Sequence, residues 1–175
     1  MADIRSRIIL KVGDITKEAA DAIVNAANSS LLGGGGVDGA IHRAAGPDLL
    51  TECAGLGGCE PGEAKTTKGY RLPAKFVIHT VGPIWRGGNS NEEKILENAY
   101  RNSLREAVRA GAKSIAFPAI STGVYRFPPE LAADIAVRTI ISFLQEDGSL
   151  DEVRLVCFSA ESAEHHKKAL DKHLS

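Results

Sequence analysis

The amino-acid sequence predicts an α/β domain in which helices cover a largely parallel sheet. Short apolar runs typical of buried strands alternate with segments of helical periodicity, and this alternation is characteristic of parallel-sheet proteins. The chain has 175 residues, of which 43% are hydrophobic, so it can bury one sizeable core. It contains no internal repeat and no low-complexity linker. We therefore expect a single domain over residues 1–175.

Six segments are predicted as strands. Five are apolar runs that fit strands covered on both faces, and one alternates more weakly, as an edge strand does. The apolar runs span residues 8–12, 22–26, 76–81, 114–118 and 153–158, and the edge strand spans residues 64–70.

Helices are predicted in the gaps between these strands. Residues 92–110 keep a helical apolar period, and Gly111 stands where a C-terminal cap belongs. Pro128 and Pro129 suit the first turn of a helix that continues through Leu144. A last helix, from about residue 162, begins with acidic residues and carries lysines further on, which matches the helix dipole.

Composition argues against several classes of partner and site. The 21 basic and 22 acidic residues leave a net charge of -1 without a block of like charge, so no nucleic-acid or membrane surface is predicted. Charged residues interrupt the N-terminal apolar residues, and no apolar run is long enough to span a membrane. We therefore expect a cytoplasmic protein.

The cysteines and histidines predict neither disulfides nor a metal centre. Cys53, Cys59 and Cys157 form no Cys-x-x-Cys pair, so we interpret them as buried, reduced thiols. The five histidines do not lie near them at metal-ligand spacing. We expect no metal and no cofactor.

Four consecutive glycines, residues 33–36, stand just before a predicted helix. Glycine lets the backbone approach a ligand closely, and the N–H groups at a helix N-terminus attract anions, so this loop predicts a phosphate site. Residues 34–39 also match Gly-x-Gly-x-x-Gly, but these glycines do not follow directly from a strand, so the dinucleotide fingerprint is weak. No Lys-Ser or Lys-Thr follows, which excludes a Walker loop.

Two further loops follow predicted strands and carry polar residues. Residues 119–125 supply small hydroxyls, a glycine and a tyrosine, and residues 13–16 supply an aspartate beside an isoleucine. Ligands collect where the carboxyl ends of parallel strands meet, so we expect the loops to converge. Ser121 resembles half of a nucleophile elbow, but Ala119 replaces the first glycine, so a phosphate-contacting or structural hydroxyl is preferred.

Two aromatic side chains have ordinary structural interpretations. His79 lies within an apolar strand, so a hydrogen-bonded core histidine is preferred to a catalytic base. Trp85 either stacks on a base or covers the edge of the core, and we prefer the second.

Five motifs, in this order, together resemble a macrodomain of the MacroD type, close to bacterial O-acetyl-ADP-ribose deacetylases. They are Gly-Asp-Ile-Thr at 13–16, Asn-Ala-Ala-Asn at 25–28, Gly-Gly-Gly-Val-Asp-Gly-Ala-Ile at 34–41, His-Thr-Val-Gly-Pro at 79–83 and Ser-Thr-Gly-Val-Tyr at 121–125. The resemblance covers nearly the whole chain. It implies a three-layer α/β/α sandwich around a mixed, mostly parallel sheet of about six strands, with a cleft for ADP-ribose.

The resemblance also implies a role for each site residue. Asp14 would bind the adenine amino group with Ile15 beside it, and Phe158 would lie against the adenine ring. Asn28 would bind the distal ribose hydroxyls, and Asp38 would stand close to the acyl ester. The diphosphate would lie between two loops, with Tyr125 near the distal ribose; the loop residues are Gly34, Gly35, Gly36 and Val37 on one side and Ser121, Thr122, Gly123 and Val124 on the other.

The resemblance therefore implies a hydrolase that removes the acetyl group from O-acetyl-ADP-ribose, and also ADP-ribose from mono-ADP-ribosylated Asp or Glu of proteins. A carboxylate can accept a proton from water, so Asp38 is the predicted general base and Asn28 an orienting residue. The substrate diphosphate is the alternative activator of the water. Structural roles remain open for both residues, Asn28 as a turn cap and Asp38 as a helix N-cap.

Other functions remain open as well. The chain is either an enzyme, a module that binds ADP-ribose without turnover, or a regulator of an RNA-processing enzyme through protein contacts. The adjacent glutamates of the glycohydrolase branch are absent after the glycines, where Val37 and Asp38 stand, so cleavage of poly-ADP-ribose is disfavoured.

Overall fold

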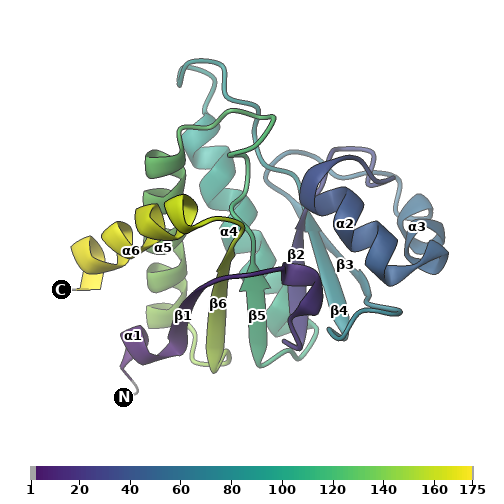
Figure 1. The fold of residues 1–175 in the computed structure, drawn as a ribbon, viewed down its shortest axis with the longest axis horizontal. Helices are drawn as coiled ribbons and strands as arrows, with labels where there is room; N and C mark the ends of the chain where they lie inside the picture. Colours follow the sequence, from purple (N-terminus) through teal and green to yellow (C-terminus); the bar gives the residue numbers. More distant parts are fainter. Residues whose placement is uncertain (1–2, 175) are drawn as a thin grey trace.

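The computed structural model describes residues 3–174, which form one six-stranded sheet with helices on both faces (Figure 1). The strands are β1 (Ile8–Val12), β2 (Ala22–Ala26), β3 (Ala64–Lys68), β4 (Phe76–Thr80), β5 (Ser114–Phe117) and β6 (Glu152–Cys157). All six predicted strands are therefore present. Four of the predicted strands extend one or two residues too far, and β6 also begins one residue earlier than predicted. Because β6 ends at Cys157, Phe158 lies just beyond it.

The sheet has the order β1-β6-β5-β2-β4-β3. Every neighbouring pair is parallel except β3 and β4, so the sheet is mixed and mostly parallel, as predicted. The register of β2 and β4 sets Asn25 opposite His79. Two polar side chains thus lie beside each other within apolar strands.

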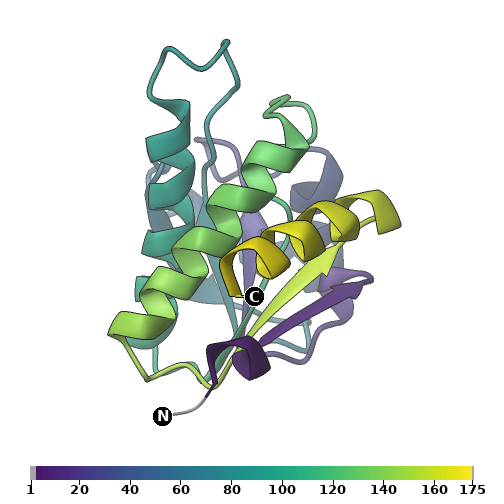
Figure 2. The same ribbon diagram turned by 90° about the vertical axis from the view of Figure 1, so that its left-hand side faces the viewer.

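Helices form the outer two layers. The helices are α1 (Ile4–Arg7), α2 (Gly36–Ala45), α3 (Pro47–Ala54), α4 (Glu92–Arg109), α5 (Pro129–Glu146) and α6 (Ala160–Leu174), with a short 3₁₀ turn, η1 (Ile15–Lys17). Helices α4, α5 and α6 share one core cluster on one face, whereas α2 and α3 pack on the other. Figure 2 shows α5 and α6 running side by side in front of the sheet.

Each face of the sheet has its own apolar core. Leu96, Leu104 and Ile140 are fully buried against one face, and Ile41 and Leu49 against the other. Burying one such side chain contributes about 1.5–3 kcal/mol, so both layers are held mainly by apolar contacts. The three-layer sandwich is confirmed.

The helix ends follow local rules. Gly111, at φ +81°, ends α4 and donates its N–H to the Val108 carbonyl at 3.0 Å, which confirms the predicted cap. Helix α6 begins two residues before the expected position, and α3 is a helix that the sequence analysis did not identify. The chain turns between α2 and α3 at Gly46, where φ is +88°.

All three cysteines are buried free thiols, as predicted, and burial raises the pKa of Cys53 to about 11. No helix within residues 3–174 combines the length and the apolar character that crossing a membrane requires.

Candidate functional site

Four loops that carry predicted site residues follow neighbouring strands at the carboxyl edge of the sheet. Asp14 follows β1, Phe158 follows β6, Ser121 follows β5 and Asn28 follows β2. Because the sheet order is β1-β6-β5-β2, these residues succeed one another along a single edge. An elongated ligand laid across this edge would meet them in that order.

Gly34 separates the two predicted catalytic side chains. A Cβ atom at Gly34 would lie 3.2 Å from Asn28 Nδ2 and 3.2 Å from Asp38 Oδ2. Gly35 and Gly36 have open space around them, and Gly36 adopts φ +57°. A ligand can therefore approach the backbone closely here, as predicted from the glycine run.

Helix α2 opens directly after this loop. Its first internal hydrogen bond runs from Gly39 N to Gly35 O at 3.2 Å. The N–H groups of Gly36, Val37 and Asp38 therefore stand at the open, electropositive end of the helix. This end can bind an anion.

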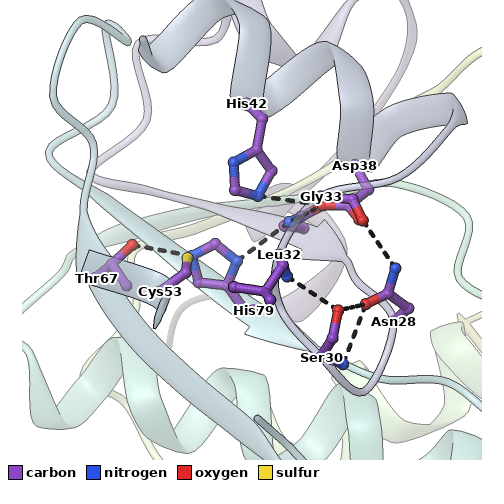
Figure 3. Close-up of polar contacts among 10 residues, drawn as sticks. Asn28, Ser30, Leu32, Gly33, Asp38, His42, Cys53, Thr67 and His79 are labelled. Atoms are coloured by element: carbon purple, nitrogen blue, oxygen red, sulfur yellow. Dashed lines mark hydrogen bonds and ion pairs between the residues drawn. The ribbon is translucent and has the colours of Figure 1, made fainter. Parts of the chain in front are cut away.

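Asp38 is a buried residue in the first turn of α2, and only 4% of it is exposed. The N-cap of α2 is Gly35, so interpreting Asp38 as an N-cap is wrong. Its Oδ1 accepts a hydrogen bond from Asn25 Nδ2 at 2.8 Å. The same oxygen lies 3.5 Å from His42 Nε2, and Figure 3 shows His42 beside Asp38. One carboxylate oxygen is therefore held by protein groups, whereas Oδ2 faces Gly34.

A directed chain of hydrogen bonds supports this carboxylate. Thr67 Oγ1 donates its proton to the backbone carbonyl of the next residue at 3.1 Å, so it accepts from His79 Nε2, 2.9 Å away. His79 Nδ1 then accepts from Asn25 Nδ2 at 3.1 Å, and the same amide donates to Asp38. His79 is neutral, because burial and the neighbouring His42 lower its pKa to about 3. The prediction of a core histidine is confirmed.

Asn28 holds the loop that leads to the glycines. Its Oδ1 accepts hydrogen bonds from Ser30 N at 3.1 Å and Ser30 Oγ at 2.6 Å, and its Nδ2 donates to Gly33 O at 2.9 Å (Figure 3). Asn28 therefore does close this turn, which is the structural role considered for it above. The same contacts fix the amide beside Gly34, opposite Asp38.

The loop of residues 119–125 is strained at Ser121. Ser121 adopts φ +68°, and its buried Oγ has no hydrogen-bond partner among the described residues. Residues with positive φ concentrate at ligand sites, where the cost of about 1–3 kcal/mol is tolerated. Beyond it, Thr122 and Tyr125 are half-buried, and Gly123 and Val124 are exposed.

A tryptophan supports this second loop from behind. Trp85 N donates to Tyr125 O at 2.8 Å, and the Trp85 ring lies 4.8 Å from that of Phe127. The indole is partly buried against the main core cluster. Trp85 therefore covers the edge of the core, as preferred above.

The far end of the edge carries the residues predicted to contact adenine. The Asp14 carboxylate accepts hydrogen bonds from Thr16 Oγ1 at 2.7 Å and Thr16 N at 2.9 Å, and these bonds lower its pKa. Ile15 is buried in the apolar core between the sheet and α2 and α3, so it anchors this loop to that core. Phe158 is 96% exposed, which leaves its ring open for stacking.

The structure adds residues that the sequence analysis did not assign to the site. His42, Asn25 and Thr67 surround Asp38 or support its partners. A signal for His42 existed, because residues four positions apart share one face of a helix. Within residues 3–174, no cluster of three His, Cys, Asp or Glu side chains is arranged to hold a metal.

Comparison with known proteins identifies close relatives. Residues 24–136 match the family model described as Macro domain. A macro domain-containing protein of Chlorobaculum tepidum is 59% identical over 157 residues, which cover 90% of this chain and 91% of the relative. An O-acetyl-ADP-ribose deacetylase of Citrobacter rodentium is 56% identical over 169 residues, covering 94% and 96%.

Solved structures agree with the sequence matches. The Oceanobacillus iheyensis macrodomain with ADP superimposes with a TM-score of 0.88 at 48% identity, covering 93% of this chain and 89% of that one. The Trypanosoma brucei macrodomain in complex with ADP-ribose gives a TM-score of 0.88 at 46% identity, covering 94% of this chain and 69% of that one.

Proposed function

The chain belongs to the macro domain family, and from this premise we propose that it binds ADP-ribose derivatives and hydrolyses the acyl ester of O-acetyl-ADP-ribose. Relatives at 53–56% identity are named O-acetyl-ADP-ribose deacetylases, and many other relatives carry only the family name. Solved neighbours contain ADP or ADP-ribose. These names support the proposal for this chain.

One observation supports the proposal most directly: the side chains of Asn28 and Asp38 lie on either side of Gly34, within the glycine loop of residues 33–36. The amide can orient a ribose hydroxyl, and the adjacent carboxylate can accept a proton. The exposed N–H groups at the start of α2 suit a diphosphate, since they provide donors without a bulky side chain. Adenine would then lie toward Asp14 and Phe158. The ligand would thus extend across the carboxyl ends of four neighbouring strands, β2, β5, β6 and β1.

The proposed reaction is hydrolysis by an activated water. Asp38 accepts one proton from the water, whose oxygen forms a bond to the acyl carbon while the carbonyl electrons move to the carbonyl oxygen. When this tetrahedral intermediate collapses, the bond between the acyl carbon and the ribose oxygen breaks. The ribose oxygen takes the proton from Asp38, and the products are acetic acid and ADP-ribose.

The neighbours of Asp38 support its role as a base. Asn25 holds Oδ1 through a hydrogen bond and His42 lies 3.5 Å from it, so the other oxygen, Oδ2, is the one directed toward the loop. A base fixed in one orientation loses less entropy on reaction than a mobile side chain. The substrate diphosphate remains the alternative activator of the water, and in that case Asp38 only orients it.

The same chemistry extends the proposal to modified proteins. ADP-ribose attached to an aspartate or glutamate side chain is also an acyl ester of the distal ribose. A water activated by Asp38 would release the protein carboxylate and ADP-ribose by the same bond changes.

The decisive experiment measures acetate release from O-acetyl-ADP-ribose by the purified protein and by Asp38→Ala. We expect kcat/KM to fall by about 10²–10⁴-fold, the usual contribution of a general base. Asp171→Ala, at an exposed position of α6, is the matched control and should leave the rate unchanged. Calorimetry with ADP-ribose checks that the Asp38 variant still binds.

Two outcomes would contradict the proposal. If the wild-type protein binds ADP-ribose but releases no acetate, it is a binding module. If acetate is released and Asp38→Ala hydrolyses the ester as fast as the wild type, the carboxylate is not the base and the diphosphate route is favoured.

A further inference from the structure

A groove lies on the α2 side of the glycine loop, next to the candidate catalytic residues. It has a volume of about 440 Å³, and its lining includes Gly33, Gly34 and His42. Gly34 borders Asn28 and Asp38, and His42 Nε2 lies 3.5 Å from Asp38 Oδ1. One end of the groove therefore lies beside the position at which the acyl group of the proposed substrate would be bound.

The groove is much larger than an acetyl group requires. Its volume falls within the roughly 300–1,000 Å³ typical of clefts that enclose whole small ligands. From Gly34 it extends along α2 to the start of α3, where Gly46, Pro47 and Leu50 line it. The proposed nucleotide would lie on the other side of the loop, across the carboxyl ends of β1, β6, β5 and β2. The groove thus provides room for a group attached beyond the ester.

Its walls combine exposed apolar side chains with accessible backbone. Leu32 is 51% exposed and Leu50 is 42% exposed, although both are large apolar residues. Gly33, Gly34 and Gly46 contribute main chain to the lining without side chains that would block it. Apolar walls with open main chain suit a polypeptide segment, which offers both side chains and hydrogen-bonding groups.

Two arginines lie at the groove, Arg43 in its lining and Arg71 beside Gly46. Arg43 is exposed and lines the groove, and its guanidinium lies over Gly39, 3.0 Å from the position of a Cβ there. Arg71 is exposed too, and its guanidinium packs on Gly46, with Nε 3.1 Å from the position of a Cβ. Within residues 3–174, neither guanidinium forms an ion pair. The nearby acidic residue of α3, Asp48, is exposed and also unpaired in this range.

We propose that this groove binds the polypeptide side of a mono-ADP-ribosylated protein and favours acidic residues next to the modified carboxyl. The inference rests on the proposed hydrolase function and adds to it a polypeptide-binding groove with a sequence preference. Leu32 and Leu50 contact the peptide, and Arg43 and Arg71 pair with its flanking carboxylates. Arg is well suited to this task because its planar guanidinium binds a carboxylate through two hydrogen bonds.

The test compares three substrates of the full chain. Two are synthetic peptides with one ADP-ribosylated glutamate, flanked by aspartates in one and by lysines in the other; the third is O-acetyl-ADP-ribose, which has no polypeptide. We expect kcat/KM to be at least tenfold higher for the aspartate peptide than for the lysine peptide. Added salt should reduce this preference, because exposed charges are screened.

Variants assign the preference to the groove. In Arg43→Glu, the ratio of kcat/KM for the aspartate peptide to that for O-acetyl-ADP-ribose should fall at least tenfold. Leu50→Ser should lower kcat/KM for both peptides relative to O-acetyl-ADP-ribose. Arg105→Glu, an equal charge change at an exposed position of α4 across the sheet, is the matched control and should preserve the preference.

Several results would overturn the inference: equal turnover of both peptides by the wild type, turnover of O-acetyl-ADP-ribose alone, or a preference that survives Arg43→Glu. Fluorescence polarisation with peptides carrying a hydrolysis-resistant ADP-ribose linkage separates this failure from that of the proposed function. If no ester is cleaved but the aspartate peptide binds more tightly through Arg43, the hydrolase proposal fails and the groove assignment stands.

Discussion

Gly39 in α2 packs directly against the carbonyl oxygen of Gly34 in the ligand loop. A Cβ atom at Gly39 would approach that backbone oxygen more closely than 3.0 Å, and it would lie 3.0 Å from the Arg43 guanidinium. Backbone atoms cannot move aside as the end of a flexible side chain can. The absence of a side chain at Gly39 therefore determines how close Gly34, Asn28 and Asp38 can be.

Gly39→Ala should destabilise the protein and impair the site together. Alanine normally stabilises a helix by about 1 kcal/mol relative to glycine, so a loss here would have to come from the clash with Gly34. We expect a loss of about 1–3 kcal/mol in the free energy of unfolding, as for an overpacked position, with weaker ADP-ribose binding. Denaturant melts and calorimetry measure the two effects. Gly148→Ala, where a Cβ meets nothing within 4 Å, is the control; a stabilised Gly39→Ala would refute the packing argument.

Gly82→Ala tests how the loop after β4 positions Ser121. A Cβ at Gly82 would clash with Ser121 Oγ, and it would lie 2.6 Å from Ile120 Cγ2. We expect lower stability and weaker ADP-ribose binding. Adding Ser121→Gly should restore part of the stability, because it removes one clashing side chain and suits φ +68°. If the double variant is as unstable as the sum of both single changes, Ser121 is not the point of contact.

Glu92 should make the protein sensitive to acid. Burial alone would raise its pKa, but the backbone N–H groups of Arg86, Gly88 and Ser90 donate to the carboxylate and hold the pKa at about 2. The pKa of a glutamate in an unfolded chain is about 4.3. The contribution of Glu92 to the free energy of unfolding is therefore complete above that pH and is lost as the pH falls toward 2. Melting temperatures of wild type and Glu92→Gln between pH 7 and pH 2 should converge in this window. Curves that stay parallel throughout would contradict the assignment.

Replacing Glu92 should also loosen the structure locally. Glu92 holds the segment between β4 and α4, which projects from the body of the molecule at the top of Figures 1 and 2. In Glu92→Gln, amide hydrogen exchange should accelerate at Arg86 and Gly88 before it does in the core strands. The control is exchange at Ile78 in β4, which should not change.

His79 should remain neutral, with its proton on Nε2, across the physiological pH range. Burial lowers its pKa to about 3, whereas an unfolded histidine titrates near about 6.5. Between these values the unfolded chain binds the proton more strongly, so stability decreases as the pH falls below 6.5. Nitrogen NMR of the ring should show the Nε2–H tautomer from pH 8 to pH 5. A ring that titrates near pH 6.5 would mean that the chain from Thr67 to Asp38 is not formed.

The sequence was sufficient for five of the strands because they are apolar runs, as a parallel sheet covered by helices requires, and the edge strand β3 was found from its weaker alternation. It also located Asn28 and Asp38 around a glycine loop, since that spacing is local. It did not reveal the pairing of Asn25 with His79, because these residues are far apart in the chain and the register of β2 and β4 brings them together. Register between distant strands depends on tertiary packing.

Helix α3 was missed for a different reason. It is short, with eight residues, and follows α2 after a single glycine, so its apolar period is too brief to stand out. The left-handed conformation of Gly46 separates the two helices. Because α3 forms one wall of the groove, the groove next to the proposed ester site could not be predicted from the sequence.

The position of β6 has a consequence for the newly synthesised chain. Within the described residues, β1 pairs with β6 alone, and β6 lies between β1 and β5. The ribosome makes Ile8–Val12 before Glu152–Cys157, so β1 has no place in the sheet until β6 has emerged. Asp14 and Phe158 thus come together only after β6 has been synthesised. Nascent chains that stop before β6 would carry the glycine loop and yet lack half of the surface on which a nucleotide could rest.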